Sequence, residues 1–340
     1  MNSDKRPGLH DVAKLAGVSH TTVSRVLNNR QYVSDKTKTK VEKAMTQLGY
    51  RPNLLARSLV TNSSATIGVL IISDSNLVGS LKILSEISVE ATKADFFTSI
   101  TSFDRSAGET LREAMFRLLD QGLAGLVVIS ARKEGLDEVL ELAKGIPLVF
   151  CKASPDKFRY RIKLENETAA YRATHQLLSL GHKNIAHFTG PRGLIDSDDR
   201  LRGFQKAMSE VGLTTDLIYE GDWSADSGYK LGKALISSGK KFTAVFSGND
   251  KMALGLIHAL NQKGIEVPRD VSIIGFDDLE ESKHYRPALT TVRQDFTEFG
   301  SRAIAMLRSQ MNGERAPNFE AMHPELVIRN SCAQLGTKSV

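Results

Sequence analysis

Hydrophobic positions over most of the chain alternate between short apolar runs and longer amphipathic stretches. The apolar runs have the length of buried strands and lie at 67–73, 96–101, 125–130, 147–151, 184–189, 217–221, 243–247 and 271–276. Helical spacing of apolar residues fills nearly every gap, for example at 110–121, 167–180 and 251–263. Strands that alternate with helices predict a parallel α/β sheet, and about eight such units favour two doubly wound lobes over one.

The N-terminal part of the chain shows short helices and no strand pattern. Apolar spacing predicts a helix at 9–16, then a break at 17–19, where Gly suits a left-handed turn and Ser suits an N-cap. A second helix is predicted at 20–28, and a third from the cap Ser34 to 48, with Gly49 after it. Two short helices joined by a tight glycine turn are typical of a helix-turn-helix, whose second helix enters the DNA major groove N-terminus first.

Basic residues are concentrated in this same part. Residues 1–62 hold 11 Lys or Arg and 4 Asp or Glu, whereas residues 63–340 hold 34 basic and 35 acidic side chains. All of the excess positive charge of the chain, formally +6 at pH 7, therefore lies in residues 1–62. A basic small domain on a neutral large one indicates nucleic-acid binding, although a solvated basic tail would show the same bias.

The predicted second helix offers a set of side chains to DNA. Its orientation puts His20 and Thr21 nearest the base edges, and Arg25 lies one turn later on the same face. Arginine can donate two hydrogen bonds to guanine O6 and N7, a contact worth ~1–3 kcal/mol of discrimination. Phosphate contacts, which position the protein without specifying sequence, are expected from Ser19, Thr22 and Ser24. The alternative is that Thr21 and Arg25 are ordinary solvated helix positions.

Residues 10–28, with the sequence HDVAKLAGVSHTTVSRVLN, closely resemble the headpiece motif of the lac/gal repressor family. The match is long and contiguous. It departs at Gly8, where the family usually caps the first helix with Thr, but Gly is an acceptable N-cap. The resemblance adds Asn28 and Tyr32 to the expected DNA contacts and implies a regulator of transcription.

The linker after the third helix is expected to take part in DNA binding. Pro52 blocks continuation of that helix, and 53–60 has helical propensity over only two turns, which is too short to be stable alone in water. In the family that the chain resembles, two hinge helices of a dimer pair in the minor groove and a leucine wedges a base step open. The matching positions are Asn53, Ala56, Arg57 and Leu59. The alternative is an ordinary linker whose leucines pack on the core.

Polar side chains follow the predicted strands, where ligands of open α/β sheets bind. These positions hold carboxylates, amides and guanidiniums around the only tryptophan: Asp74, Asn76, Asp104, Arg105, Asp199, Arg200, Trp223, Asn249, Asp250, Asp277 and Asp278. Carboxylates and amides suit vicinal hydroxyls, and an indole face suits the C–H face of a pyranose. The pattern therefore predicts a sugar pocket, and its alternative is that these residues cap helices or fill the core.

The large domain is also similar to the type I periplasmic sugar-binding fold that the same repressor family uses as its core. The positions that match effector contacts of the family are Arg200, Asn249 and Asp277. Two more, Trp223 and Arg105, resemble positions used by its sugar-responsive members, and Asp74 follows the first predicted strand. The expected effector contacts are Asp74, Arg105, Arg200, Trp223, Asn249 and Asp277. The chain departs at 77–79, where many members have aromatic side chains, and at 165–166, where Asp-Asn is usual. The first departure leaves the identity of the effector open.

The resemblance implies a division of the chain into a headpiece, a hinge and two lobes. The headpiece is expected at 1–50 and the hinge with its linker at 51–62. The N-terminal lobe of the core would take 63–163 and 291–322, and the C-terminal lobe would take 164–290 and 323–340.

The sequence lacks the features that several other classes of protein need. The apolar runs are far shorter than the ~20 residues of a membrane span, and no apolar signal core follows the charged N-terminus. Cys151 and Cys332 make neither a disulfide framework nor a zinc pattern, so the expected location is the reducing cytoplasm. No GxSxG, GxxxxGK[ST] or HExxH motif is present, and no catalytic, metal or cofactor role is expected. A transported-sugar binding protein would share the large domain but would need a signal peptide and no basic headpiece.

These features together predict a cytoplasmic repressor of carbohydrate-metabolism genes. It is expected to bind a pseudo-palindromic operator in double-stranded DNA as a homodimer, with its affinity set allosterically by a sugar-like effector. The short polar segment after residue 329 favours a dimer over the tetramers that some family members form through a C-terminal heptad helix. A sugar phosphate, a nucleoside or a protein corepressor is the alternative effector, and activation is the alternative to repression.

Overall fold

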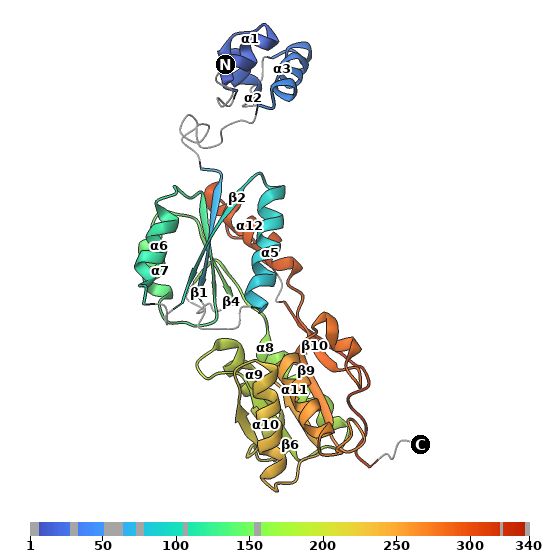
Figure 1. The fold of residues 1–340 in the computed structure, drawn as a ribbon. Helices are drawn as coiled ribbons and strands as arrows, with labels where there is room; N and C mark the ends of the chain where they lie inside the picture. Colours follow the sequence, from blue (N-terminus) through green and yellow to red (C-terminus); the bar gives the residue numbers. More distant parts are fainter. Residues whose placement is uncertain are drawn as a thin grey trace. The chain divides into compact units, whose positions relative to one another are not determined.

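The computed structural model describes residues 7–27, 33–50, 64–72, 78–104, 108–152, 158–319 and 322–336. The chain forms two separately compact units, Met1–Ala65 and Thr66–Val340 (Figure 1). Within the described ranges, no helix combines the length and the apolar character that crossing a bilayer requires.

The first unit is a bundle of three helices, α1 (Leu9–Ala16), α2 (His20–Leu27) and α3 (Asp35–Leu48). The turn between α1 and α2 is made by Gly17 in the left-handed region, at φ 65°. Gly49 ends α3 in the same region, at φ 61°. The buried core is small and comes from all three helices: Val12, Ala13, Ala16, Val23, Val41 and Ala44. The predicted helix-turn-helix is therefore confirmed in its helices, its turn and its buried face.

The second unit begins with a five-stranded parallel sheet in the order β2-β1-β3-β4-β5. Its strands are β1 (Thr66–Ile72), β2 (Phe97–Phe103), β3 (Gly125–Ser130), β4 (Leu148–Lys152) and β5 (Arg161–Ile162). Helices α5 (Val78–Lys93) and α12 (Thr297–Met311) pack on one face, and α6 (Leu111–Leu119) and α7 (Leu136–Leu142) on the other (Figure 1). This sheet with its two helical layers is the first lobe.

A second sheet of six strands has the order β11-β10-β9-β8-β6-β7, parallel except for β11. Its strands are β6 (Ile185–Thr189), β7 (Ile218–Glu220), β8 (Ala244–Ser247), β9 (Ser272–Asp277), β10 (Thr290–Arg293) and β11 (Glu325–Val327). One face is covered by α8 (Asn166–Ser179) and α9 (Ile195–Glu210), the other by α10 (Ala225–Ser237) and α11 (Asp250–Asn261). The short 3-10 helix η2 (Glu280–His284) follows β9. This second lobe completes the predicted fold of two doubly wound lobes, which is confirmed.

The chain crosses between the lobes three times: between β5 and α8, between β10 and α12, and before β11. The residues 291–293 were predicted to belong to the first lobe, and this is wrong. Thr290–Arg293 pairs with β9 along Ile274–Asp277, so the return to the first lobe comes after Arg293. The boundary was misplaced because β10 is polar and short and therefore has no strand signature of its own.

Candidate functional site

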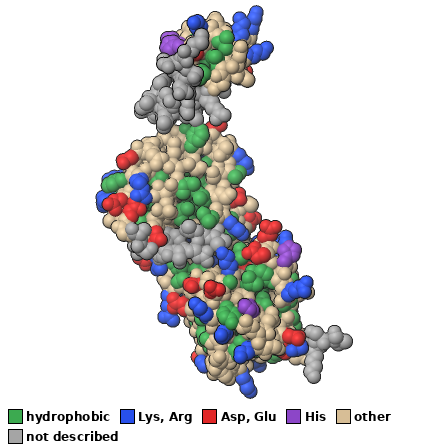
Figure 2. All heavy atoms as spheres, viewed as in Figure 1, with side chains coloured by type: hydrophobic (Ala, Val, Ile, Leu, Met, Phe, Trp, Pro, Cys, Tyr) green, Lys and Arg blue, Asp and Glu red, His purple; other side chains and the backbone are tan. Residues whose placement is uncertain are grey.

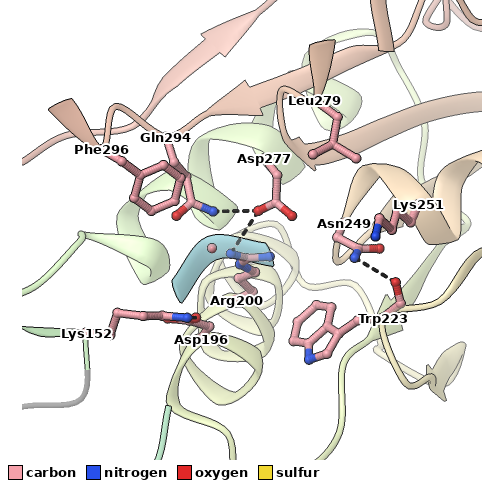
Figure 3. A pocket seen from close by; sticks show the side chains of 11 residues that line it. Lys152, Asp196, Arg200, Trp223, Asn249, Lys251, Asp277, Leu279, Gln294 and Phe296 are labelled. Carbon is pink, nitrogen blue, oxygen red and sulfur yellow. Dashed lines mark hydrogen bonds and ion pairs between the residues drawn. The ribbon is translucent and has the colours of Figure 1, made fainter. Parts of the chain in front are cut away.

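A cavity that is partly open to solvent lies at the carboxyl ends of the second-lobe strands, and residues of the first lobe also line it (Figure 3). The first lobe contributes Gly79, Lys152 and Phe296. The second lobe contributes Asp196, Arg200, Trp223, Asn249, Lys251, Asp277 and Leu279, and Gln294 comes from the segment between β10 and α12. The cavity therefore brings together four of the six predicted effector residues, Arg200, Trp223, Asn249 and Asp277.

Arg200, on α9, is the buried cation of this site, with 4% of its surface exposed. Its Nε donates to Asn166 Oδ1 at 3.2 Å, its Nη1 to the Gly248 carbonyl at 2.5 Å, and its Nη2 to Asp277 Oδ1 at 3.4 Å. The guanidinium also stacks over the Phe276 ring, 3.7 Å from the ring centroid. Because donors on each of its three nitrogens have acceptors, Arg200 is held in one orientation before any ligand arrives.

Asp277 lies at the end of β9, with φ 106°. Its Oδ1 accepts hydrogen bonds from Gln294 Nε2 at 2.6 Å and from Arg200. Burial raises the pKa of Asp277 above its usual range, and the charge of Arg200 opposes that rise. A non-glycine residue at such a φ is a strained conformation of the kind that gathers at ligand sites. The carboxylate points toward Arg200 and Gln294 in the cavity (Figure 3).

Trp223 presents its indole to the cavity, and two small residues make room for it. Its backbone has φ 71°. A Cβ at Gly190 would overlap the indole ring, and one at Gly248 would lie 3.2 Å from it. Asn249 donates through Nδ2 to the Trp223 carbonyl at 2.9 Å, and its Oδ1 accepts from Met252 N as the N-cap of α11. Both polar atoms of Asn249 are thus engaged in holding Trp223 and starting a helix.

Lys152 and Asp196 line the cavity from opposite lobes, and their side chains meet at its edge (Figure 3). Lys152 Nζ lies 2.7 Å from Asp196 Oδ2, and Asn166 Nδ2 donates to Asp196 Oδ1 at 3.0 Å. Burial by itself raises the pKa of Asp196, but the charges of Lys152 and Arg200 outweigh it and hold the pKa below its usual range. Neither residue was predicted. The rule of reading residues after each strand would have found Lys152, which directly follows the predicted strand 147–151.

Two acidic residues that follow strands stabilise loops instead of lining the cavity. Asp250 is fully buried and accepts hydrogen bonds from Leu279 N, Ser282 Oγ and Thr291 Oγ1. Burial raises its pKa to about 7. Asp278 forms ion pairs with Arg293 at 2.7 Å and Arg329 at 2.6 Å. Both therefore hold the segment that directly follows Asp277 at the end of β9.

The second helix of the headpiece exposes the residues predicted to read DNA. His20, Thr21 and Arg25 are exposed, whereas Val23 on the opposite face is buried. Ser19 Oγ accepts from Thr22 N at 3.1 Å and so caps α2, and it lies within hydrogen-bond distance of the hydroxyls of Thr21 and Thr22. Thr22 and Ser24 are partly exposed on the same helix. Basic side chains project from the headpiece surface (Figure 2).

The remaining predicted site residues lie outside the described part of the chain. They are the DNA-contact positions Asn28, Tyr32, Asn53, Ala56, Arg57 and Leu59 and the effector positions Asp74 and Arg105. Their roles stay predictions.

Two family models match the chain. Residues 8–53 match "Bacterial regulatory proteins, lacI family", and residues 174–332 match a periplasmic binding protein-like domain. Similar curated proteins include the HTH-type transcriptional repressor PurR of Vibrio parahaemolyticus, 36% identical over 96% of this chain and 99% of that protein. They also include the lactose operon repressor of Escherichia coli, 32% identical over 97% of this chain and 92% of that protein.

Solved structures agree with these matches. The lac repressor dimer bound to operator and the anti-inducer ONPF has a TM-score of 0.88 and 32% identity, over 97% of this chain and 100% of that chain. The complex of the transcriptional regulator CelR with cellobiose has a TM-score of 0.71 and 28% identity, over 96% of this chain and 100% of that one. The family predicted from residues 10–28 is confirmed, and relatives that are repressors agree with the expectation of a non-enzyme. The chain belongs to the lacI family of bacterial regulatory proteins.

Proposed function

We propose that this protein represses carbohydrate-metabolism genes as a cytoplasmic homodimer on a pseudo-palindromic operator, and that a pyranose sugar in the cavity sets its operator affinity. The observation that carries the effector assignment is the Arg200–Asp277 pair beside the Trp223 indole. Within the described residues Asp277 Oδ2 has no hydrogen-bond partner, so this oxygen is available to a ligand. A carboxylate that accepts from hydroxyls next to an aromatic face is the combination that a sugar ring needs.

The second candidate effector is a nucleobase or nucleoside. Both the Trp223 indole and the Phe296 ring line the cavity, and a planar base gains stacking energy against such a ring. Sugar is preferred because the polar groups of the cavity are carboxylate, ammonium and amide groups set at several angles around it, which suits hydroxyls on a puckered ring better than the edge of a flat base (Figure 3).

The position of the cavity supports an allosteric role. Its walls come from both lobes, so a ligand that prefers one lobe arrangement shifts the balance between arrangements by its differential affinity. We propose that this shift acts on the paired hinge segments at 51–62 and thereby on the headpieces. The effector can then change the operator affinity only by as much as its own affinity differs between the two lobe arrangements.

Thermal-shift screening of the full-length protein against sugars, sugar phosphates and nucleosides tests the proposal, since a bound ligand raises the apparent stability. We expect a pyranose to raise the melting temperature and to change the operator affinity in a subsequent titration. A nucleoside hit with no sugar hit would replace the sugar by the second candidate. A response to neither class would assign regulation to a protein partner or remove the effector from the proposal.

A further inference from the structure

Lys152 and Arg200 both line the cavity, but their cationic groups are held by different numbers of partners. Arg200 donates to three separate acceptors and is buried, so it cannot turn toward a ligand without losing them. Lys152 has a single ion-pair partner among the described residues, Asp196, and its side chain is 12% exposed. An ammonium has three donors and a flexible stem, so Lys152 can exchange its partner.

The Lys152 side chain lines more than one cavity. Together with Gly79 and Asp196 it lines the cavity that contains Arg200 and Asp277, and a Cβ at Gly79 would be in ordinary van der Waals contact with Lys152 Nζ, at 3.8 Å. Lys152 and Asp196 also line a neighbouring polar cavity, whose other lining residues include Glu165, Asn166 and Arg202. The ion pair is therefore accessible from two sides.

Asp196 keeps two stabilising interactions if Lys152 changes partner. Its Oδ1 keeps the hydrogen bond from Asn166 Nδ2 at 3.0 Å, and the charge of Arg200 still stabilises its ionised form. Its side chain is 16% exposed, and it also lines the second cavity. An incoming group that replaces Asp196 must itself be negatively charged, because a buried ammonium left without a counter-charge is costly.

The balance of charge in the cavity also favours an anion. Its lining holds three cations, Lys152, Arg200 and Lys251, against two carboxylates, Asp196 and Asp277. A neutral sugar leaves one positive charge in excess, whereas a ligand with one negative group balances it.

We propose that the effector is an anionic pyranose, bearing a phosphate ester or a carboxylate, and that Lys152 binds this anionic group in exchange for its ion pair with Asp196. The inference rests on the proposed function of the cavity and names the class of sugar. Because Lys152 lies at the end of β4 in the first lobe and Asp196 on α9 in the second, the exchange removes a contact between the lobes. Binding of the anionic group is thereby coupled directly to the lobe arrangement.

Matched pairs of ligands test this inference on the full-length protein by calorimetric titration. Galactose is compared with galactose 6-phosphate and galacturonate, and glucose with glucose 6-phosphate and glucuronate, with inorganic phosphate as the probe for the anion alone. We expect one anionic sugar to bind roughly 10- to 100-fold more tightly than its neutral partner, the range of a charge-assisted contact. The phosphate and carboxylate members identify which anionic group is recognised.

Variants then assign the preference to Lys152. Lys152→Met should remove the difference between the members of a pair, Lys152→Arg should retain most of it, and Asp196→Asn should tighten the anionic member by freeing the ammonium. Lys251→Met removes the same charge from the same cavity and should have a smaller effect. Circular dichroism of each variant checks that it is folded.

Three results would overturn the inference in different ways. Neutral sugars that bind as tightly as anionic ones would refute the anionic effector and leave the sugar-responsive repressor intact. If Lys251→Met and Lys152→Met lost the preference for anionic sugars equally, the preference would come from the overall positive potential of the cavity and not from a specific contact with Lys152. Absence of binding by every sugar of both kinds would refute the proposed effector class itself, and this inference with it.

Discussion

The helix predicted to read DNA and the candidate ligand cavity of this protein are built in opposite ways. On α2, the candidate contacts His20, Thr21 and Arg25 come from consecutive turns of one short helix and point into solvent. In the cavity, Arg200 and Asp277 are 77 positions apart and their side chains hold each other in place. A substitution on α2 should therefore change binding and leave folding alone, whereas a substitution in the cavity should change both.

The largest effect is expected for Arg200→Ala. Removing one member of a buried, hydrogen-bonded ion pair leaves the carboxylate of Asp277 without its counter-charge, which typically costs about 3–5 kcal/mol. The variant should unfold at lower denaturant concentration and should lose the effector response. Arg202→Ala on the same helix is the control, because its ion pairs with Glu167 and Asp199 lie at the surface and should contribute less than about 1 kcal/mol. If both variants lost the same unfolding free energy, burial of the Arg200–Asp277 ion pair would not be the cause of the loss.

Asp250 should make stability depend on pH. Its folded-state pKa of about 7 lies above the unfolded value near 3.8, so the folded protein binds the extra proton between these pH values. The contribution of Asp250 to stability is therefore fully present below about pH 4 and is lost as pH rises to about 7, by roughly 2–4 kcal/mol.

The measurement for Asp250 is the difference in unfolding free energy between the wild-type protein and Asp250→Asn from pH 4 to pH 8. A difference is needed because buried His187, whose pKa burial lowers to about 4, gives the opposite slope between pH 4 and 6.5. The stability of the wild-type protein relative to the variant should fall with rising pH. Parallel curves would show that Asp250 does not titrate in this range.

Asp277→Ala separates ligand binding from DNA binding. Loss of the acceptor for ligand hydroxyls should weaken effector binding by about 1.5–3 kcal/mol and abolish the effector response. Because Arg200 loses its counter-charge, the variant should also unfold more easily, but operator binding without effector should persist at temperatures at which it is folded. Fluorescence titration with effector and operator measures the two affinities separately. The exposed Asp226 in the same lobe supplies the control Asp226→Ala, which should respond normally. A normal response in Asp277→Ala would move the binding site elsewhere.

Arg25→Ala should have the smallest effect on the fold and a selective effect on DNA. Operator affinity should fall by ~1–3 kcal/mol with non-specific affinity nearly unchanged, because a base contact is lost and no phosphate contact. Unfolding should be unaffected, since the side chain is exposed. Binding to operator and scrambled DNA at one salt concentration gives the comparison, with Lys38→Ala on α3 as a second exposed basic position. An equal loss on both DNAs would make Arg25 a phosphate contact.

Sequence patterns predicted the buried strands well because their apolar runs are continuous. The run at 125–130 matches β3, Gly125–Ser130, and the run at 271–276 lies within one residue of β9. The strands β5 and β11 were not predicted, since two or three residues carry no period. The headpiece was predicted to the residue at α1, where caps, turn and apolar spacing all agree.

The cavity was predicted in part. Residues placed directly after strands, such as Asp277 and Asn249, share one edge of the sheet in any parallel α/β fold, so their convergence follows from topology. Gln294 and Phe296 were not predicted, because they reach the cavity from the segment in which the chain recrosses between lobes.

The sequence by itself determined the family, the helix-turn-helix and the two-lobed α/β core, because these depend on local spacing of apolar residues, glycines and caps. Only the tertiary structure decided which polar groups are engaged and which are available. Asn249 is occupied by a helix cap, Arg200 by three acceptors and Asp250 by three donors, whereas Lys152 holds one partner across the lobes. Burial and hydrogen-bond partners come from residues far apart in the chain, so no local pattern can specify them.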